Sequence, residues 1–232
     1  ERERFDVIHV NGSGDHKQVM LALVGMHPRP RIVFTKHNDH ALKSFGHSLR
    51  ARWATDCVIA VSDYIKDLVL DSPYKRCDVR TIRHGINTNF FAPVSQDERL
   101  ALRTAQLGSL AADKLVLVST AGTDYEKGWL DLVAGVALLP ERLRQRFHIV
   151  VAGDYPSAEK LARVEALSMS GQVSYPGLID DVRAVLAAGD IGYVLSYQEA
   201  LSFACRELMA LGLPVLVTRV GGLPERSEEH TS

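Results

Sequence analysis

Short runs of β-branched and apolar residues alternate with stretches of helical periodicity along most of the chain. Nine such runs predict strands, at residues 6–10, 31–35, 57–61, 79–83, 115–119, 148–152, 172–175, 191–195 and 214–218. Between them, apolar residues recur every three to four positions, as at residues 129–139, 158–168 and 181–188. This alternation is typical of βαβ units, which build parallel sheets. The pattern therefore predicts an α/β fold.

One stretch interrupts the alternation. Residues 85–93 (Gly-Ile-Asn-Thr-Asn-Phe-Phe-Ala-Pro) combine turn formers and a proline without an amphipathic period, which indicates a linker. Four predicted strands precede this linker and five follow it. We therefore expect two doubly wound, Rossmann-like domains, over residues 1–92 and 93–225, with a cleft between them.

Both ends of the chain depart from the pattern. The first predicted strand begins close to Glu1, with no initial methionine, so we expect the N-terminal domain to be incomplete. The last seven residues, 226–232 (Arg-Ser-Glu-Glu-His-Thr-Ser), continue neither a helix nor a strand, and a common sequencing adapter read in frame would encode them. We interpret them as a non-native tail, and the chain as a fragment cut at both ends.

The charge of the chain is nearly balanced but unevenly distributed. A net charge of −1 argues against a dedicated nucleic-acid binder. Residues 1–95 carry 14 Lys and Arg against 10 Asp and Glu, and the remainder carries 13 against 18. The basic first part favours either an anionic membrane surface or a phosphorylated substrate, unless the asymmetry is a chance difference between two domains.

Cysteine usage and hydropathy bear on the compartment. The chain has three cysteines with no Cys-x-x-Cys spacing, and this odd number favours a reducing cytosol. No apolar run approaches the roughly 18 residues that a membrane-spanning helix needs. We therefore expect a cytoplasmic protein whose contact with a membrane, if it has one, is peripheral.

The most informative segment lies near the end of the chain. It predicts a helix that starts shortly after Glu199, contains Glu207 and stops at Gly212, before a strand that Pro214 opens. The start of a helix presents backbone N–H groups and a positive dipole end to a phosphate. A carboxylate further along such a helix can accept two ribose hydroxyls, and Glu199 would lie nearer a sugar beyond the phosphates. The segment therefore predicts a nucleotide-sugar site.

A series of motifs in register extends this interpretation. The series resembles the C-terminal half of retaining glycosyltransferases of the GT-B fold, known as group 1 or family 4, in which the two glutamates form the E-x7-E motif. Segments 33–37 and 57–62 are similar to strands of that family's N-terminal domain. The motifs of the series are residues 79–85, 126–128, 151–154, 176–177, 188–190, 196–207, 212–215 and 221–225.

The resemblance implies a role for each matching position. Glu207 would hold the ribose hydroxyls and Glu199 would contact the donor sugar. Lys127 would neutralise the departing pyrophosphate, and His37 would face the donor sugar from the other domain. The further implied contacts are backbone N–H groups around Ala200, Leu201, Ser202 and Phe203 at the pyrophosphate, and the loop at Gly177 and Leu178 beside the nucleobase.

Two positions depart from the family pattern. Many members carry an arginine shortly before the Lys-Gly pair, where this chain has residues 121–124 (Ala-Gly-Thr-Asp). One of two cationic pyrophosphate contacts is then missing or is supplied by another residue. Ser202 stands where the family commonly has glycine, which keeps a small residue near the phosphates.

His37 has two alternative interpretations, an ordinary histidine at the end of a strand or a metal ligand within the histidine-rich run at residues 37–40. His37 and His40, with His47 later, lack both the usual zinc spacing and cysteine partners. The chain also contains no Asp-x-Asp sequence that would hold a metal on a pyrophosphate. We therefore expect neither a metal nor a cofactor.

These features predict transfer of a sugar from a nucleotide-sugar to an acceptor hydroxyl with retention of configuration. The acceptor is expected to be a sugar or a lipid-linked glycan, for instance in the synthesis of a lipopolysaccharide core or another bacterial cell-surface polysaccharide. Two alternatives remain open. The missing arginine fits a non-catalytic nucleotide-sugar-binding protein, and the GT-B architecture is shared by a sugar-nucleotide epimerase.

Overall fold

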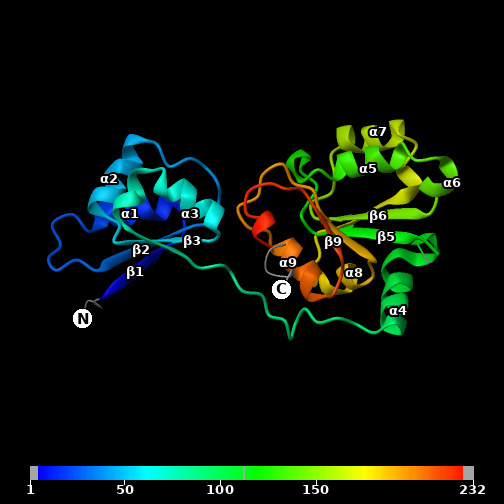
Figure 1. Ribbon diagram of the computed structural model, residues 1–232, viewed down its shortest axis with the longest axis horizontal. Helices are drawn as coiled ribbons and strands as arrows, with labels where there is room; N and C mark the ends of the chain where they lie inside the picture. The colour runs from blue at the N-terminus through cyan, green and yellow to red at the C-terminus, as the bar shows by residue number, and fades with distance from the viewer. Residues whose placement is uncertain (1–4, 112, 227–232) are drawn as a thin grey trace. The chain divides into compact units, whose positions relative to one another are not determined.

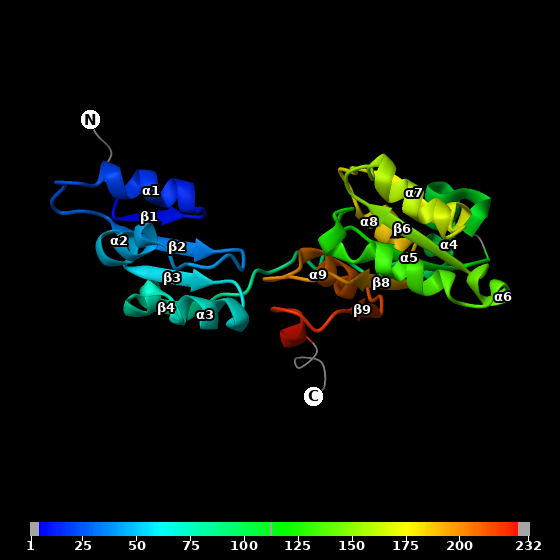
Figure 2. The same ribbon diagram turned by 90° about the horizontal axis from the view of Figure 1, so that it is seen from above.

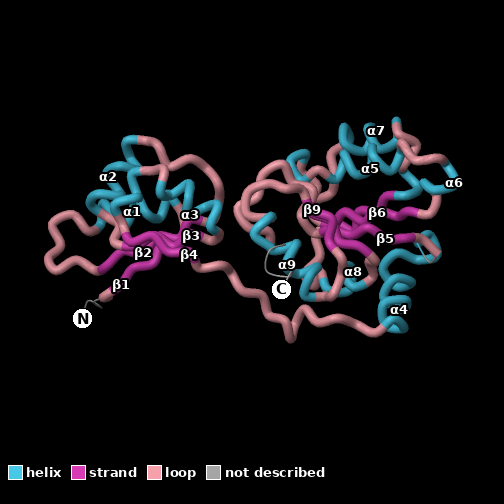
Figure 3. The backbone as a smooth tube through the Cα atoms, viewed as in Figure 1, coloured by secondary structure: helices cyan, strands magenta, loops and turns pink. Residues whose placement is uncertain are grey.

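The computed structural model describes residues 5–111 and 113–226, and these fold into two parallel α/β sheets (Figures 1 and 3). The nine strands within these described ranges coincide with the nine predicted ones, so the α/β fold class is confirmed. None of the helices in the described ranges is both long and apolar enough to cross a membrane. The predicted tail lies outside the described residues, apart from Arg226.

The chain divides into two compact units. Unit 1 comprises the described residues of Glu1–Gly85 and Arg219–Ser232 together with Gln198–Leu201, and unit 2 comprises Ile86–Tyr197 and Ser202–Thr218. Two short segments from late in the sequence therefore pack with the first unit. The expected domain boundary between residues 92 and 93 stays a prediction.

Unit 1 is a sheet with helices on one face. Its strands lie in the order β1-β2-β3-β4 (Figure 2), and they are β1 Val7–Val10, β2 Arg31–Lys36, β3 Cys57–Ala60 and β4 Asp78–Thr81. The helices α1 Ser13–Ala22, α2 Phe45–Trp53 and α3 Asp63–Leu70 lie on the same side of it (Figure 1). Each right-handed crossover places its strand on the same side of the previous strand, and this puts all three helices on one face of the sheet. The core forms where these helices meet buried strand side chains such as Ile32, Phe34 and Val58.

Unit 2 is doubly wound. Its sheet has the order β7-β6-β5-β8-β9, with the strands β5 Leu115–Ser119, β6 Phe147–Ala152, β7 Val173–Gly177, β8 Ile191–Val194 and β9 Val215–Val217. Helices α5 Trp129–Ala137 and α7 Ala158–Ala166 cover one face, whereas α4 Gln96–Leu107, α8 Arg183–Ala187 and α9 Phe203–Ala210 lie on the other (Figure 1). The short α6 Glu141–Arg144 precedes β6. Because the chain reverses direction across the sheet at β5 and β8, the crevice outside the ends of these strands is where such folds bind ligands.

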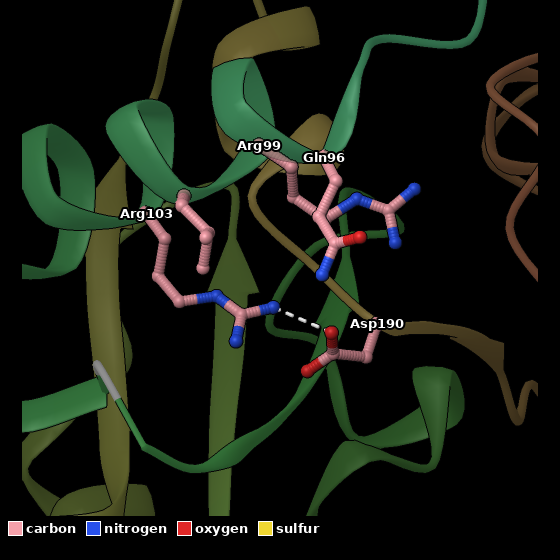
Figure 4. A pocket seen from close by; sticks show the side chains of 5 residues that line it. Gln96, Arg99, Arg103 and Asp190 are labelled. Carbon is pink, nitrogen blue, oxygen red and sulfur yellow. Dashed lines mark hydrogen bonds and ion pairs between the residues drawn. The ribbon is translucent and has the colours of Figure 1, made fainter.

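An ion pair fixes α4 to the unit 2 sheet at the amino-terminal ends of the central strands β5 and β8. Arg103 donates from Nη2 to Asp190 Oδ1 at 2.6 Å and from Nε to the Ala188 carbonyl at 3.0 Å. The other oxygen of Asp190 accepts the N–H of Val116 at 2.8 Å, which joins the beginnings of β5 and β8. Figure 4 shows the pair in a pocket that Gln96 and Arg99 also line.

Replacing Asp190 therefore tests the stability of unit 2. Asp190→Ala leaves the buried Arg103 guanidinium without its counter-charge, and we expect the free energy of unfolding to fall by about 3 kcal/mol, because a broken buried pair costs more than an exposed one. Urea denaturation followed by circular dichroism measures the change. Asp180→Ala, at an exposed carboxylate, is the control and should stay within about 0.5 kcal/mol of the parent. Equal stabilities of the two variants would contradict this account.

Candidate functional site

The loops that follow β5, β6 and β7 meet through glycine backbones. Gly153 has a φ of +141°, and a Cβ added there would lie 2.6 Å from the Cα of Gly122. The N–H of Gly153 donates to the carbonyl of Gly177 at 3.1 Å. Gly122 and Gly177 also have positive φ, at +96° and +80°, which residues with a Cβ rarely adopt. The loops after these three strands thus approach one another through backbone atoms.

The loop that carries Lys127 is held against the end of β8. A Cβ added to Gly128 would lie 2.0 Å from the Leu195 carbonyl oxygen, and its φ of +67° is left-handed. The N–H of Tyr197 donates to the Glu126 carbonyl at 2.8 Å. Lys127 itself is half-buried in the short 3₁₀ turn Tyr125–Lys127. The glycine of the Lys-Gly pair is therefore what allows the lysine loop to lie beside β8.

Helix α9 begins at the position that the sequence predicted. Ser202 is its N-cap, and its Oγ accepts the N–H of Cys205 at 3.3 Å. Serine is among the best N-cap residues, which gives the departure from glycine at this position a structural reason. The first helical residue, Phe203, is half exposed. The helix ends at Ala210, and Gly212 follows with a φ of +74°.

Glu207 lies on α9 beside the end of β5. Thr120 Oγ1 donates to Glu207 Oε2 at 3.5 Å, so the contact bridges the loop after β5 and the helix after β8. Burial raises the pKa of Glu207, and the Thr120 hydrogen bond opposes this shift only in part. Thr120 was not predicted, although a hydroxyl residue directly after a strand at the reversal point is the available signal.

Arg206, the neighbour of Glu207, was also missed. Its side chain is 5% exposed, and none of its three guanidinium nitrogens has a hydrogen-bond partner among the described residues. A buried guanidinium without a counter-charge costs several kcal/mol. The start of the same helix carries the positive end of its dipole.

The first glutamate of the pair belongs to unit 1. The N–H of Gly222 donates to the Glu199 carbonyl at 3.0 Å, and a Cβ on Gly221 would lie 1.8 Å from that oxygen. Ala200 joins the hydrophobic core of unit 1. The Gly-Gly sequence at 221–222 is therefore required for close backbone packing against residues 199 and 200.

Glu225 completes this attachment. Its carboxylate accepts the N–H groups of Asp63 and Tyr64, at 2.9 and 2.7 Å, at the start of α3. Ser62 Oγ accepts the next N–H, that of Ile65, at 3.2 Å. A carboxylate at a helix start is favoured both by these bonds and by the helix dipole. The conspicuous glutamate of the Gly-Gly-Leu-Pro-Glu sequence thus has a structural role in unit 1.

His37 lies at the end of β2 with both ring nitrogens engaged. Nε2 contacts Asn11 Oδ1 and Nδ1 contacts His84 Nε2, each at 3.1 Å. Burial, together with the nearby His84 and His9, lowers the pKa of His37. His47 instead bonds Ser44, the N-cap of α2. Residues 5–111 and 113–226 contain no group of three or more His, Cys, Asp or Glu that could hold a metal ion, and metal independence stays a prediction.

The structure therefore separates the predicted site residues into two sets. Those in unit 2 are Lys127, Gly177, Leu178, Ser202, Phe203 and Glu207, and those in unit 1 are His37, Glu199, Ala200 and Leu201. Within unit 2, Lys127 and Glu207 follow β5 and β8, the two strands at the reversal point. Leu178 is 79% exposed after β7. The individual roles of these residues stay predictions.

Two family profiles cover nearly all of the chain. The profile described as glycosyl transferases group 1 matches residues 112–231, which is more than half of the chain. The profile described as glycosyltransferase family 4 matches residues 1–90. The order of the two matches is the order of the two sheets.

Curated proteins of several lineages are similar to the chain. The lipopolysaccharide core biosynthesis glycosyltransferase LpsE of Rhizobium meliloti is 31% identical over 169 residues, covering 72% of this chain and 45% of that protein. One of the human phosphatidylinositol N-acetylglucosaminyltransferase subunits is 34% identical over 235 residues, covering 99% and 46%. The chain thus spans about half the length of the curated relatives it matches.

Solved structures confirm the fold. HepE of Anabaena, crystallised with UDP and glucose, superposes with a TM-score of 0.79 at 20% identity, over 95% of this chain and 61% of HepE. WaaG, a glycosyltransferase involved in lipopolysaccharide biosynthesis, superposes with a TM-score of 0.67 at 20% identity, over 95% and 69%. Both sheets of this chain thus have the GT-B, Rossmann-like arrangement.

Gly128 and Gly135 offer a matched test of the Lys127 loop. Gly128→Ala should lower the free energy of unfolding by at least about 2 kcal/mol, because its φ is left-handed and the new Cβ meets the Leu195 carbonyl. Gly135→Ala, in the middle of α5 with open space around it, should instead stabilise by about 0.5–1 kcal/mol. Thermal and urea unfolding of both variants measure the difference. A Gly128 variant as stable as the parent would refute the close approach.

Proposed function

The chain belongs to the group 1 glycosyl transferases, and we propose that its protein is a retaining glycosyltransferase that moves a sugar from a nucleotide-sugar to an acceptor hydroxyl. In this reaction the bond from the anomeric carbon to the diphosphate breaks, and a bond to the acceptor oxygen forms on the same face of the sugar. The acceptor proton passes to the departing phosphate oxygen. The main task of the protein is then to stabilise negative charge on the leaving diphosphate.

The contact between Thr120 and Glu207 is the observation that carries this proposal. It joins the loops after β5 and β8, where a doubly wound sheet reverses and ligands bind. We propose that Glu207 holds the ribose hydroxyls there and that the glycine backbones after β6 and β7, with Leu178, border the nucleobase. The hydrogen bond between the Gly153 and Gly177 backbones and the exposed side chain of Leu178 support this assignment.

Positive charge near α9 suits a diphosphate. We propose that Lys127 and the N–H groups at Ser202 and Phe203 contact the pyrophosphate. Arg206 adds a buried, uncompensated charge to the same helix, which supports anion binding despite the missing arginine before Lys127. No Asp-x-Asp sequence is present, and we therefore propose a metal-independent mechanism without a cofactor.

The donor side is also supported by similar proteins. HepE of Anabaena has been crystallised with UDP, with UDP and glucose, and with UDP-glucose. A nucleoside diphosphate sugar is therefore the proposed donor. We further propose that Glu199 and His37 contact the donor sugar, and that the backbone N–H groups of Ala200 and Leu201 contact the pyrophosphate.

For the acceptor we propose a sugar or a lipid-linked glycan. The name of LpsE and the description of WaaG refer to lipopolysaccharide synthesis, and the excess of basic residues in the first 95 positions suits a phosphorylated or membrane-bound acceptor. We also propose that the protein is cytoplasmic and contacts the inner face of a membrane peripherally. The acceptor side is assigned to residues 1–92.

Two alternatives are separated by simple assays. Isothermal titration of the full-length protein with several nucleotide-sugars, run beside a product assay, distinguishes a transferase from a non-catalytic binder, because only the transferase forms product. Incubation of donor without acceptor, followed by NMR of the sugar, detects an epimerase. Binding without turnover, or an epimer, would replace the proposal.

Two substitutions test the site in the full-length protein. Lys127→Ala and Glu207→Ala should each lower the rate of transfer by about 10²–10³. Loss of one contact that stabilises the transition state commonly has an effect of this size. Lys114→Ala and Glu165→Ala, on the same unit but outside the proposed site, should keep the parent rate. Melting temperatures check folding. Near-normal turnover in either site variant would defeat the assignment.

A further inference from the structure

Three loops of unit 1 bring Asn11, His37 and His84 together. Asn11 follows β1, His37 follows β2 and His84 follows β4, so the group lies at the carboxyl end of the parallel sheet. The rings of His37 and His84 are nearly parallel, with centroids 5.2 Å apart and an interplanar angle of 7°. His84 was in the motif series, but it had no assigned role.

The hydrogen bonds fix the proton positions in this group. Asn11 Oδ1 can only accept, so the nitrogen that faces it, His37 Nε2, carries the hydrogen. A neutral imidazole then has an acceptor at Nδ1. His84 Nε2 is 3.1 Å from that atom and donates to it. The chain of bonds runs from His84 through His37 to Asn11 in one direction.

Electrostatics favour the neutral form of His37. Burial lowers the pKa of His37, and the two other histidines that face it, His84 beyond β4 and His9 on β1, lower it further. The ring of His9 is itself hydrogen-bonded, with its Nε2 2.6 Å from Thr35 Oγ1. A proton added to His37 Nδ1 would also confront the hydrogen on His84. These neighbours therefore favour the neutral form of His37.

We propose that His84 is a positioning residue that keeps His37 as a neutral donor at Nε2. This inference rests on the proposed function, in which His37 contacts the donor sugar. A sugar oxygen would replace Asn11 Oδ1 as the acceptor of the Nε2 hydrogen. His37 then acts by hydrogen bonding and not as a general base. A neutral ring also avoids repelling the positive charge that an oxocarbenium-like sugar develops.

Nitrogen NMR of the protein labelled with ¹⁵N-histidine tests the proton positions without any activity. In the parent, His37 should carry its proton on Nε2 with Nδ1 unprotonated. His84→Ala should raise the pKa of His37 and make the Nδ1–H form detectable, because both a donor and a neighbouring charge are lost. His84→Asn, whose amide can still donate, should keep the parental tautomer. His40→Ala, an exposed histidine nearby, is the control.

A parental His37 with its proton on Nδ1 would overturn the proposal. So would an Ala variant at position 84 with unchanged pKa and nitrogen signals at His37. These results are independent of turnover, so they distinguish failure of this inference from failure of the proposed function. Circular dichroism and melting temperature confirm that each variant is folded.

Kinetics of the full-length transferase test the consequence. His84→Ala should lower kcat about tenfold, roughly the effect of one misdirected hydrogen bond, and His84→Asn should restore most of it. Because activity needs neutral His37, the rate falls as pH drops through its pKa. The acid limb of the profile should therefore move to higher pH in His84→Ala. An unaltered kcat and profile in that variant would refute the positioning role.

Discussion

Close approach of backbone to backbone at the strand ends is the constraint on which the candidate site depends. Gly128 has no room for a Cβ beside the Leu195 carbonyl, and Gly153 has none beside Gly122. These contacts bring the lysine loop to the end of β8 and let the loops after β5 and β6 approach each other closely. In unit 1, Gly221 likewise allows close backbone packing against the carbonyl of Glu199.

Burial affects the charged groups of α9 more strongly than hydrogen bonds or ion pairs do. The Thr120 hydrogen bond to Glu207 is long, at 3.5 Å, so the loss of water dominates and raises the pKa of this carboxyl. Arg206 is buried without a partner among the described residues, and the helix dipole adds to its charge. A carboxylate suited to neutral hydroxyls thus lies next to a region suited to an anion. We propose that a nucleoside diphosphate binds to this combination.

Much of the fold could be predicted from the sequence, because parallel strands produce short runs of β-branched and apolar residues that are easy to recognise. All nine strands and the start of α9 followed from such runs and from the turn chemistry at Ser202 and Gly212. The grouping of Glu199 and Glu225 with the first sheet could not be predicted. It depends on a cap that Glu225 supplies to α3 from more than 100 residues away in the sequence, and on glycine contacts between residues 221–222 and 199–200. The hydrogen bond between His37 and His84 was hidden for the same reason.

The anomeric configuration of the product tests the central claim most directly. Full-length protein is incubated with an α-linked nucleotide-sugar and an acceptor glycan, and the anomeric coupling constant of the purified product is measured by NMR. The account predicts transfer with an α-linkage retained in the product. A β-linked product, or no transfer to any acceptor while the nucleotide-sugar still binds, would contradict it.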